Sequence, residues 1–278
     1  FTFKVFSSNI NDFYRDLILS TGSTAHLDLL FNILPDLPSL SSEEAIYRNL
    51  GLDYIEPELR EGLNEIEQAQ NHTLPKLIQY KDLRGTLHNH STYSDGVHSL
   101  EQMALHCKDV LGLDYLGICD HSKTAVYANG LSVERLEEQW QEIATLNEKL
   151  APFKIFRGIE SDILGDGSLD YPDEILAKFD FVGASVHSNL KMDEERATAR
   201  LIKAIENPYT TILGHPTGRL LLSRAGYPLD FKKVIDACAA NGVVIEINAN
   251  PLRLDLDWRW HRYAVEKGVL LSVNPDAH

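Results

Sequence analysis

Cysteine, methionine and basic residues are scarce in this chain of 278 residues. It has three cysteines and two methionines, and its 41 acidic residues outnumber 26 lysines and arginines, for a net charge of −15. The cysteines, Cys107, Cys119 and Cys238, match no metal-binding or redox spacing, so we predict that they are reduced residues of the core. The acidic balance excludes a broad electrostatic platform for nucleic acid.

Long apolar runs are also absent, and no stretch reaches the length that spans a bilayer. The first residues, FTFKVFSSNINDFYRDLIL, lack the basic and apolar regions of a secretory signal. We therefore expect a cytoplasmic protein without membrane contact. Glycine-rich phosphate loops, G-x-S-x-G elbows and CxxC pairs are missing too, which excludes several common kinds of active site. No pattern in the chain predicts an oligomeric state.

The first part of the chain, residues 1–62, mixes helical patterns with Pro-punctuated segments. Helices are predicted up to Gly22, over Ala25–Ile33, and from a cap at Ser41 or Ser42 to Gly51. We predict a small N-terminal α+β subdomain over residues 1–62. A loosely structured linker, residues 63–83, follows it.

Strand and helix patterns alternate from residue 84 to residue 278. The strand-like runs are GTLHNH, YLGICDH, KIFRGIESDI, FVGASVH, TTILGHP, VVIEINAN and VLLSVNPDAH. The helix-like stretches between them are Ser99–Leu111, Ser132–Leu150, Pro172–Ala177, Glu194–Glu206, Asp230–Asn241 and Leu256–Lys267. Seven strands joined by helical crossovers predict an α/β fold with a parallel sheet closed as a barrel.

Six of the eleven histidines and three carboxylates fall at the ends of these predicted strands. They are His88, His90, Asp95, His121, Glu160, His187, His215, Asp276 and His278. Because the carboxyl ends of parallel barrel strands meet at one mouth, we expect these side chains to converge there. The alternation of a strand would point His88 and His90 to the same face, where they can share one ion.

Imidazole and carboxylate ligands without thiolates suit zinc, manganese or iron. Nine ligands exceed what one tetrahedral ion uses, so we predict two or three divalent metals, with Glu160 as a bridging ligand. Such a site is typical of metal-assisted hydrolysis of phosphate esters, because metals lower the pKa of bound water and neutralise charge on phosphoryl oxygens.

Other polar residues lie in loops at the same predicted mouth. Lys123, Arg219 and Arg224 are candidates to bind phosphate in the catalytic step, or else they are solubilising surface residues. Asp120 and the pair Asn248 and Asn250 each have two possible roles. Asp120 either orients an imidazole or serves as a cap or loop carboxylate. The pair at Asn248 and Asn250 either hydrogen-bonds the substrate or caps the strand end.

The motif series LHNHSTYSDG, ICDHSKT, RGIESDIL, GASVHSN, ILGHPTGR, EINANP and NPDAH resembles the polymerase and histidinol phosphatase (PHP) family over residues 84–278. The stretches DGSLDYPDEILAKFDFVGASVHSN and GHPTGRLLLSR resemble the PHP domain of bacterial X-family DNA polymerases. In the first part of the chain, STGSTAHL and EEAIYRNLGLDYIEPELREG resemble the thumb of such a polymerase.

The resemblance implies a distorted, TIM-like (β/α)7 barrel with a trinuclear metal site. It also implies 3′→5′ exonuclease activity on DNA ends in repair, in a chain that lacks the polymerase active site and is truncated after His278. Carried over residue by residue, the ligand sets are His88, His90, Glu160 and Asp276; then Glu160, His187 and His215; then Asp95, His121 and His278. The alternatives are a histidinol-phosphatase-type monoesterase and a non-catalytic PHP module that supports the polymerase.

Overall fold

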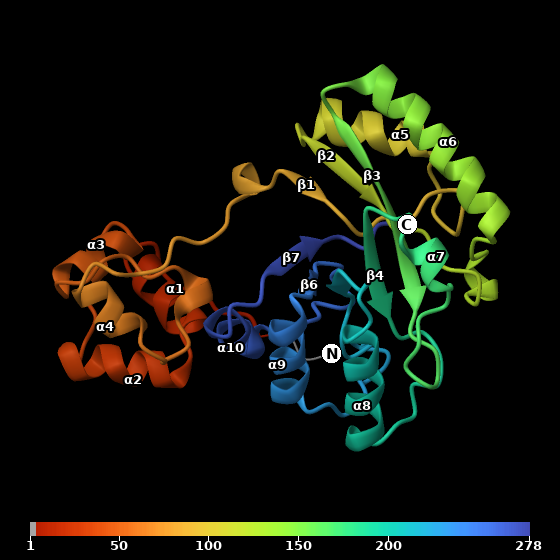
Figure 1. Ribbon diagram of the computed structural model, residues 1–278. Coiled ribbons are helices and arrows are strands. Elements are labelled where there is room, and N and C mark those ends of the chain that lie inside the picture. Colours follow the sequence, from red (N-terminus) through yellow and green to blue (C-terminus); the bar gives the residue numbers. More distant parts are fainter. Residues whose placement is uncertain (1–3) are drawn as a thin grey trace. The chain divides into compact units, whose positions relative to one another are not determined.

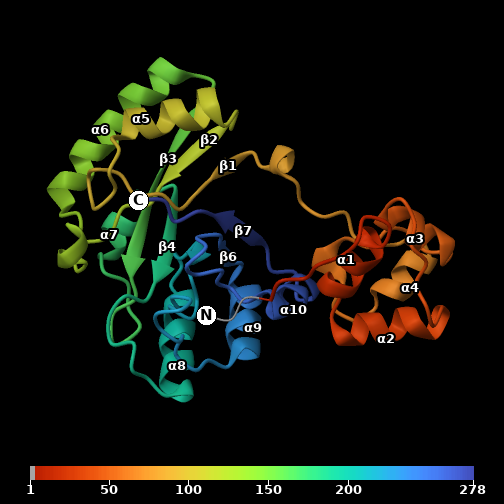
Figure 2. The ribbon, with the colours of Figure 1, turned by 180° about the vertical axis from the view of Figure 1, so that it is seen from behind.

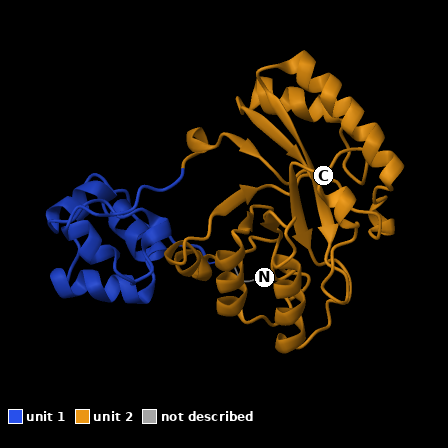
Figure 3. Ribbon diagram, in the orientation of Figure 1, with its two compact units in different colours: residues 1–78 blue, residues 79–278 orange. Residues whose placement is uncertain are grey.

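A computed structural model describes residues 4–278. The chain divides into two compact units, residues 1–78 and residues 79–278 (Figure 3). The boundary between the units falls inside the linker predicted for residues 63–83. Over the described part of the chain, no helix is long and apolar enough to cross a membrane.

The first unit is built from short helices. Its elements are α1 (Phe13–Thr21), α2 (Thr24–Ile33), α3 (Glu43–Asn49), a 3-10 turn (Pro57–Leu59) and α4 (Glu65–Gln70). Ser23 and Ser42 cap α2 and α3 by accepting hydrogen bonds from the N–H groups of His26 and Ala45, as expected for serine at these positions.

The prediction of an α+β subdomain is wrong, because no strand occurs among residues 4–78. The extended segment after α3 makes no strand pairing within residues 4–78, although Asp53 N–H donates to the Ala69 carbonyl of α4 at 3.2 Å. Instead, Leu52 and Ile55 lie in coil, and their apolar side chains are buried in the core formed by the helices. Helix α4 also lies within the predicted linker, and its Ile66 and Ala69 belong to the same core.

The buried side chains of Glu65, His26 and Tyr47 form a hydrogen-bonded series inside this unit. Burial lowers the pKa of His26, although Glu65 opposes the shift, so the imidazole is neutral near pH 7. Nδ1 of His26 lies 2.7 Å from Glu65 Oε1, and Nε2 lies 3.0 Å from the Tyr47 hydroxyl. A neutral ring can therefore donate to the carboxylate and accept from the phenol, which satisfies both nitrogens.

The second unit is a nearly closed barrel of seven parallel strands in sequential order (Figure 1). The strands are β1 (Gly85–Thr86), β2 (Tyr115–Ile118), β3 (Lys154–Asp162), β4 (Phe181–Ser185), β5 (Ile212–Leu213), β6 (Val244–Asn248) and β7 (Leu271–Asn274). Strands β1 and β7 meet only beyond their carboxyl ends, where His90 N–H donates to the Ala277 carbonyl at 2.8 Å. This seam confirms the distorted barrel.

Helices alternate with the strands, as predicted. They are α5 (Leu100–Leu105), α6 (Val133–Leu150), α7 (Asp173–Leu176), α8 (Glu194–Ile205), α9 (Phe231–Asn241) and α10 (His261–Glu266). The predicted helix over Ser99–Leu111 continues past α5 as a π-helical segment, His106–Val110. Helices α5 and α6 lie along β2 and β3, whereas α8 and α9 lie side by side on another flank (Figures 1 and 2).

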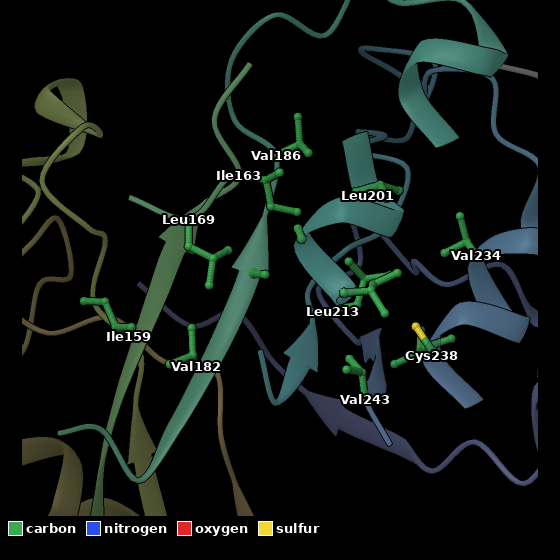
Figure 4. Packing of buried hydrophobic residues seen from close by; sticks show 14 of the residues in the cluster. Ile159, Ile163, Leu169, Val182, Val186, Leu201, Leu213, Val234, Cys238 and Val243 are labelled. Atoms are coloured by element: carbon green, nitrogen blue, oxygen red, sulfur yellow. The ribbon is translucent and has the colours of Figure 1, made fainter. Parts of the chain in front are cut away.

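The main core fills the space between β3–β6 and helices α8 and α9 (Figure 4). Ile159, Val182 and Leu213 from the strands are buried with Leu201 of α8 and Val234 of α9. Burying a side chain of this size stabilises the fold by about 1.5–3 kcal/mol. The core therefore holds the strand ends, and the residues after them, in fixed positions.

Small residues adjust the packing inside the barrel. A Cβ on Gly158 of β3 would lie 2.1 Å from Cζ of Phe181, so only glycine leaves room for that ring. The predicted role of the cysteines is confirmed, since Cys107, Cys119 and Cys238 are buried and unpaired.

The hydrogen bonds of neutral His26 to Glu65 and Tyr47 predict that the stability of the first unit decreases in acid. The folded state holds His26 neutral, with a pKa below the ordinary 6.5, so the unfolded state takes up the proton first as the pH falls. The stability of this unit should be fully present above pH 6.5. Below that pH it should fall by at most about 1.4 kcal/mol per pH unit for this proton. Hydrogen exchange of the α2 and α3 amides, corrected for intrinsic rates, measures the effect.

A His26→Gln variant is the control, because its amide does not titrate in this range. We expect its exchange protection to be lower at pH 7.5 and to change less between pH 7.5 and pH 5.5. An equal pH dependence in both proteins would show that another group is responsible.

Candidate metal centre

The nine predicted ligands lie at the carboxyl ends of the barrel strands. Glu160 is the one inside a strand, near the end of β3, and the others follow strands in coil or single bridges. The predicted strand through His90 is shorter than expected, since β1 ends at Thr86. His88 and His90 lie in its extended continuation with their ring centroids 5.2 Å apart.

The Glu160 carboxylate lies at the middle of the cluster. Its oxygens are within 4 Å of a ring nitrogen from five histidines, at 2.9 Å (His215), 3.0 Å (His121), 3.3 Å (His88), 3.3 Å (His187) and 3.7 Å (His90). The side chain of Glu160 is 1% exposed. A carboxylate in this position can contribute to more than one ion.

Ligand atoms from eight of the nine residues form three overlapping groups, each within 4.8 Å. The groups are His88, His90 and Asp276; His121, Glu160 and His187; and His90, Asp95, His121 and His278. His215 is outside these groups but contacts Glu160. His88 and His90 share one group, but His90 also joins Asp95 in another, so the groups only partly follow the ligand sets that the family resemblance implies.

The residues present fit metal ions. Several buried side-chain atoms of the cluster have no hydrogen-bond partner within residues 4–278: His88 Nε2, His90 Nδ1 and Nε2, His121 Nδ1, His215 Nδ1 and Glu160 Oε2. Leaving such atoms unpaired in the protein interior is costly. Neutral imidazole nitrogens and carboxylate oxygens are also the donor set that zinc and manganese accept.

Two carboxylates outside the predicted set hold the ligand histidines. Glu246 Oε1 lies 2.6 Å from His88 Nδ1, and Glu246 Oε2 accepts the His215 N–H at 2.9 Å. Asp162 Oδ1 lies 2.5 Å from His187 Nδ1. These contacts leave Nε2 of His88 and of His187 facing Glu160, the arrangement in which an outer carboxylate orients a metal-binding imidazole.

Sequence reasoning missed both of these carboxylates, although a signal existed. Glu246 is the one charged residue in the apolar run VVIEIN, and it is fully buried. Asp162 follows Glu160 by two residues, which places it on the same face of β3. A carboxylate inside a buried strand requires a partner, and this requirement could have identified both.

The cluster shifts the pKa values of its own groups. Burial raises the pKa of Glu160, but the neighbouring charges of His187, His88 and His121 outweigh burial and hold that pKa well below its usual range. Burial lowers the pKa of His187, but Glu160 and Asp162 raise it to about 10. At His187 the carboxylates therefore favour positive charge, carried by the imidazole or by a cation that replaces its proton.

Asp276 connects the cluster to an arginine that sequence reasoning did not single out. Asp276 Oδ1 lies 3.2 Å from His90 Nε2. Its Oδ2 contacts Arg253 Nε at 3.0 Å and accepts from Asn248 Nδ2 at 3.0 Å. Asn248 is fully buried and donates to Asp276, so its partner is a predicted metal-binding residue and not the substrate. Asn250, by contrast, accepts the Leu252 N–H and shapes the turn after β6.

The three predicted phosphate-binding residues have contacts of their own. Arg219 bonds Asp257 at 2.8 Å, and it also donates to the backbone carbonyl of Arg253 at 2.8 Å. Arg224 donates to the Gly218 carbonyl at 2.7 Å. Lys123 is exposed, with Nζ 5.6 Å from the centre of the Tyr171 ring. Arg219 thus holds the loop that carries Arg253, and the phosphate contacts of all three stay predictions.

Asp120 resolves into one of its two alternatives. Its carboxylate accepts from Ser91 N–H and Ser91 Oγ at 2.7 Å, from Ser94 Oγ at 2.5 Å and from Gln139 Nε2 at 2.7 Å. Within residues 4–278, no imidazole is among the hydrogen-bond partners of Asp120. Asp120 is therefore a loop carboxylate, and it fixes the segment that carries Asp95.

The chain is similar to several known proteins. A model of the PHP domain matches residues 86–250. The DNA polymerase/3′-5′ exonuclease PolX of Bacillus subtilis is 42% identical over 243 residues, which are 87% of this chain and 42% of that protein. A probable phosphatase of Caldanaerobacter subterraneus is 38% identical over 146 residues, which are 49% of this chain and 55% of that protein.

Among solved structures, histidinol phosphate phosphatase from Lactococcus lactis, complexed with zinc, L-histidinol and phosphate, has a similar fold. Its TM-score is 0.53 at 18% sequence identity, over 70% of this chain and 86% of that one. The chain spans about half the length of the curated relatives it matches. With the family model covering more than half of its residues, this chain belongs to the PHP domain family.

Proposed function

We propose that this protein is a metal-dependent phosphodiesterase that removes nucleotides from DNA 3′ ends during repair. The observation that carries the proposal is the convergence of six imidazoles and three carboxylates, six of whose buried nitrogen and oxygen atoms have no hydrogen-bond partner within residues 4–278. The choice of DNA as substrate rests on the similarity to PolX, a relative whose name includes a 3′-5′ exonuclease.

Two or three divalent metals, zinc, manganese or iron, are proposed to occupy the three groups of ligands. When bound, they supply the Lewis acidity that activates water and neutralises charge on the phosphoryl oxygens. Glu246 and Asp162 keep His88 and His187 oriented toward that position. These contacts fix the ligands before the substrate arrives, which limits reorganisation during the reaction.

Positive charge beside the cluster is proposed to come from Arg253. Its Nε contacts Asp276, and its Nη1 is buried with no partner in the described part of the chain. Arg219 holds the backbone of this residue in place. An arginine fixed in this way can offer a guanidinium N–H to a phosphoryl oxygen with little loss of side-chain entropy.

The helical first unit is proposed to correspond to part of a polymerase thumb, in a cytoplasmic bacterial protein that binds DNA. The alignment with PolX spans 87% of the chain, more than residues 79–278 alone can supply. Similarity therefore extends into the first unit.

Hydrolysis of a small phosphate monoester is the second candidate. It is favoured by the similarity to probable phosphatases and to the fold of a histidinol phosphate phosphatase. A module without catalytic activity is disfavoured, because the loss of metal ligands would be its signature, and all nine predicted ligand positions carry an imidazole or a carboxylate.

The proposal predicts Mn²⁺-dependent release of label from 3′-labelled single-stranded DNA. A His88→Ala/His90→Ala variant should lose more than about 100-fold of this activity, since removing even an outer partner of a ligand costs 10–100-fold. Label release with Mn²⁺ and with EDTA measures the dependence on metal. A His72→Ala/His106→Ala variant, which replaces two exposed histidines outside the cluster, should keep the activity.

The outcomes separate the candidates. Absence of any metal-dependent degradation by the parent protein would contradict the nuclease proposal. Release of phosphate from histidinol phosphate, with DNA left intact, would support the second candidate. Full activity in the His88→Ala/His90→Ala variant would place the active site elsewhere.

Glu246 yields a second prediction, on metal affinity. In a Glu246→Gln variant the side chain can no longer accept hydrogen bonds from both His88 and the His215 N–H through two carboxylate oxygens. We expect metal affinity to fall about 10–100-fold. Competition with a chelator, together with metal content by mass spectrometry, measures this change. Glu148→Gln, on the exposed face of α6, is the matched control, and an unchanged affinity in Glu246→Gln would contradict the assigned role.

A further inference from the structure

An exposed aromatic ring lies next to the metal centre and has no role in the ligand set. Tyr127 belongs to a 3-10 turn, Val126–Ala128, in the loop between β2 and α6. Its ring centroid is 6.2 Å from that of His121, a ligand of two of the three groups. Tyr127 is 73% exposed, whereas His121 is 5% exposed. The ring therefore stands at the border between the buried cluster and solvent.

The loop that carries Tyr127 is fixed on both sides. Leu131 N–H donates to the His121 carbonyl at 2.9 Å, which closes the loop at its base. Thr124 Oγ1 donates to Asp162 at 3.0 Å, and the Asn129 side chain donates to the Tyr93 carbonyl at 3.2 Å. A large ring on an anchored loop loses little entropy when it binds a ligand, which is why rigid loops often carry binding residues.

The neighbours of the phenol are groups of the centre. Partial burial, together with the negative charges of Asp162, Glu160 and Asp95, raises the pKa of Tyr127 to about 12. The phenol is therefore neutral at physiological pH. Its hydroxyl lies in the field of the cluster while most of the ring surface is open to solvent.

We propose that Tyr127 is a stacking platform for the base of the nucleotide whose phosphodiester is held at the cluster. This inference rests on the proposed function, and it narrows the substrate to a nucleic acid end that carries a base. Tyrosine rings stack on any base, so the platform would bind without sequence preference. A small monoester without a ring would gain nothing from it.

The test compares two oligonucleotides that differ only in their 3′-terminal nucleotide, one with a base and one abasic. The chain of 278 residues, loaded with Mn²⁺, is used, and kcat/KM is measured for the parent, Tyr127→Ala and Tyr127→Phe. We expect Tyr127→Ala to lose about 10-fold on the base-containing end and to match the parent on the abasic end. Tyr127→Phe keeps the ring and should behave like the parent.

A binding experiment gives a readout that does not depend on turnover. An oligonucleotide with 3′-terminal 2-aminopurine and a hydrolysis-resistant terminal linkage should lose fluorescence on binding to the parent but not to Tyr127→Ala. Val126→Ala, on the same exposed turn, should quench like the parent. Equal metal content in all four proteins would exclude an indirect effect through His121.

Three results would overturn the proposal: an equal loss by Tyr127→Ala on both oligonucleotides, no loss on either, or a loss by Tyr127→Phe as large as that by Tyr127→Ala. Each leaves the proposed function standing, because the parent still degrades DNA. A parent that degrades neither oligonucleotide would instead contradict the proposed function itself, and the platform with it.

Discussion

The buried carboxylate of Glu160, surrounded by five imidazoles, is the contact on which the second unit depends. A carboxylate removed from water costs several kcal/mol unless opposite charge or hydrogen-bond donors compensate for it. Here the compensating groups come from segments that follow β1, β2, β4 and β5, so the cost is met only when these strand ends are in place. Charge balance at one point thus specifies the arrangement of most of the barrel.

The layers around this point have separate tasks. Glu246 and Asp162 set the direction of the imidazoles, and Asp120 fixes the segment that carries Asp95. Arg219 acts indirectly, because it binds the loop that brings Arg253 to Asp276. Most of these supporting contacts lie inside the protein, so few of them are available to a substrate. The loop that carries Tyr127 combines anchoring with exposure.

How much of this could be predicted depends on the range of the interactions. The barrel and its ligand residues follow from local patterns, because strand periodicity and the convergence of parallel strand ends need no knowledge of distant contacts. The lone carboxylate in VVIEIN marks Glu246 as a residue that needs a partner, but the pairing with His88, 158 residues away in the sequence, could not be predicted from local patterns. Strands were expected before residue 62 because coil with buried apolar residues, such as Leu52 and Ile55, has the composition of a strand. Whether such a segment forms a strand or stays coil depends on whether another segment pairs with it, and composition does not show this.

The seam between β1 and β7 has a consequence for the chain as a polymer. The two ends of the barrel sequence are joined by one backbone bridge, yet both deliver ligands to the same group, His88 and His90 from one end and Asp276 from the other. An ion held by that group closes a ring that contains nearly the whole barrel. The entropy lost by the unfolded chain on closing a ring grows with the length of the ring. In this protein a metal centre would act as a reversible cross-link of nearly the greatest span that the barrel allows.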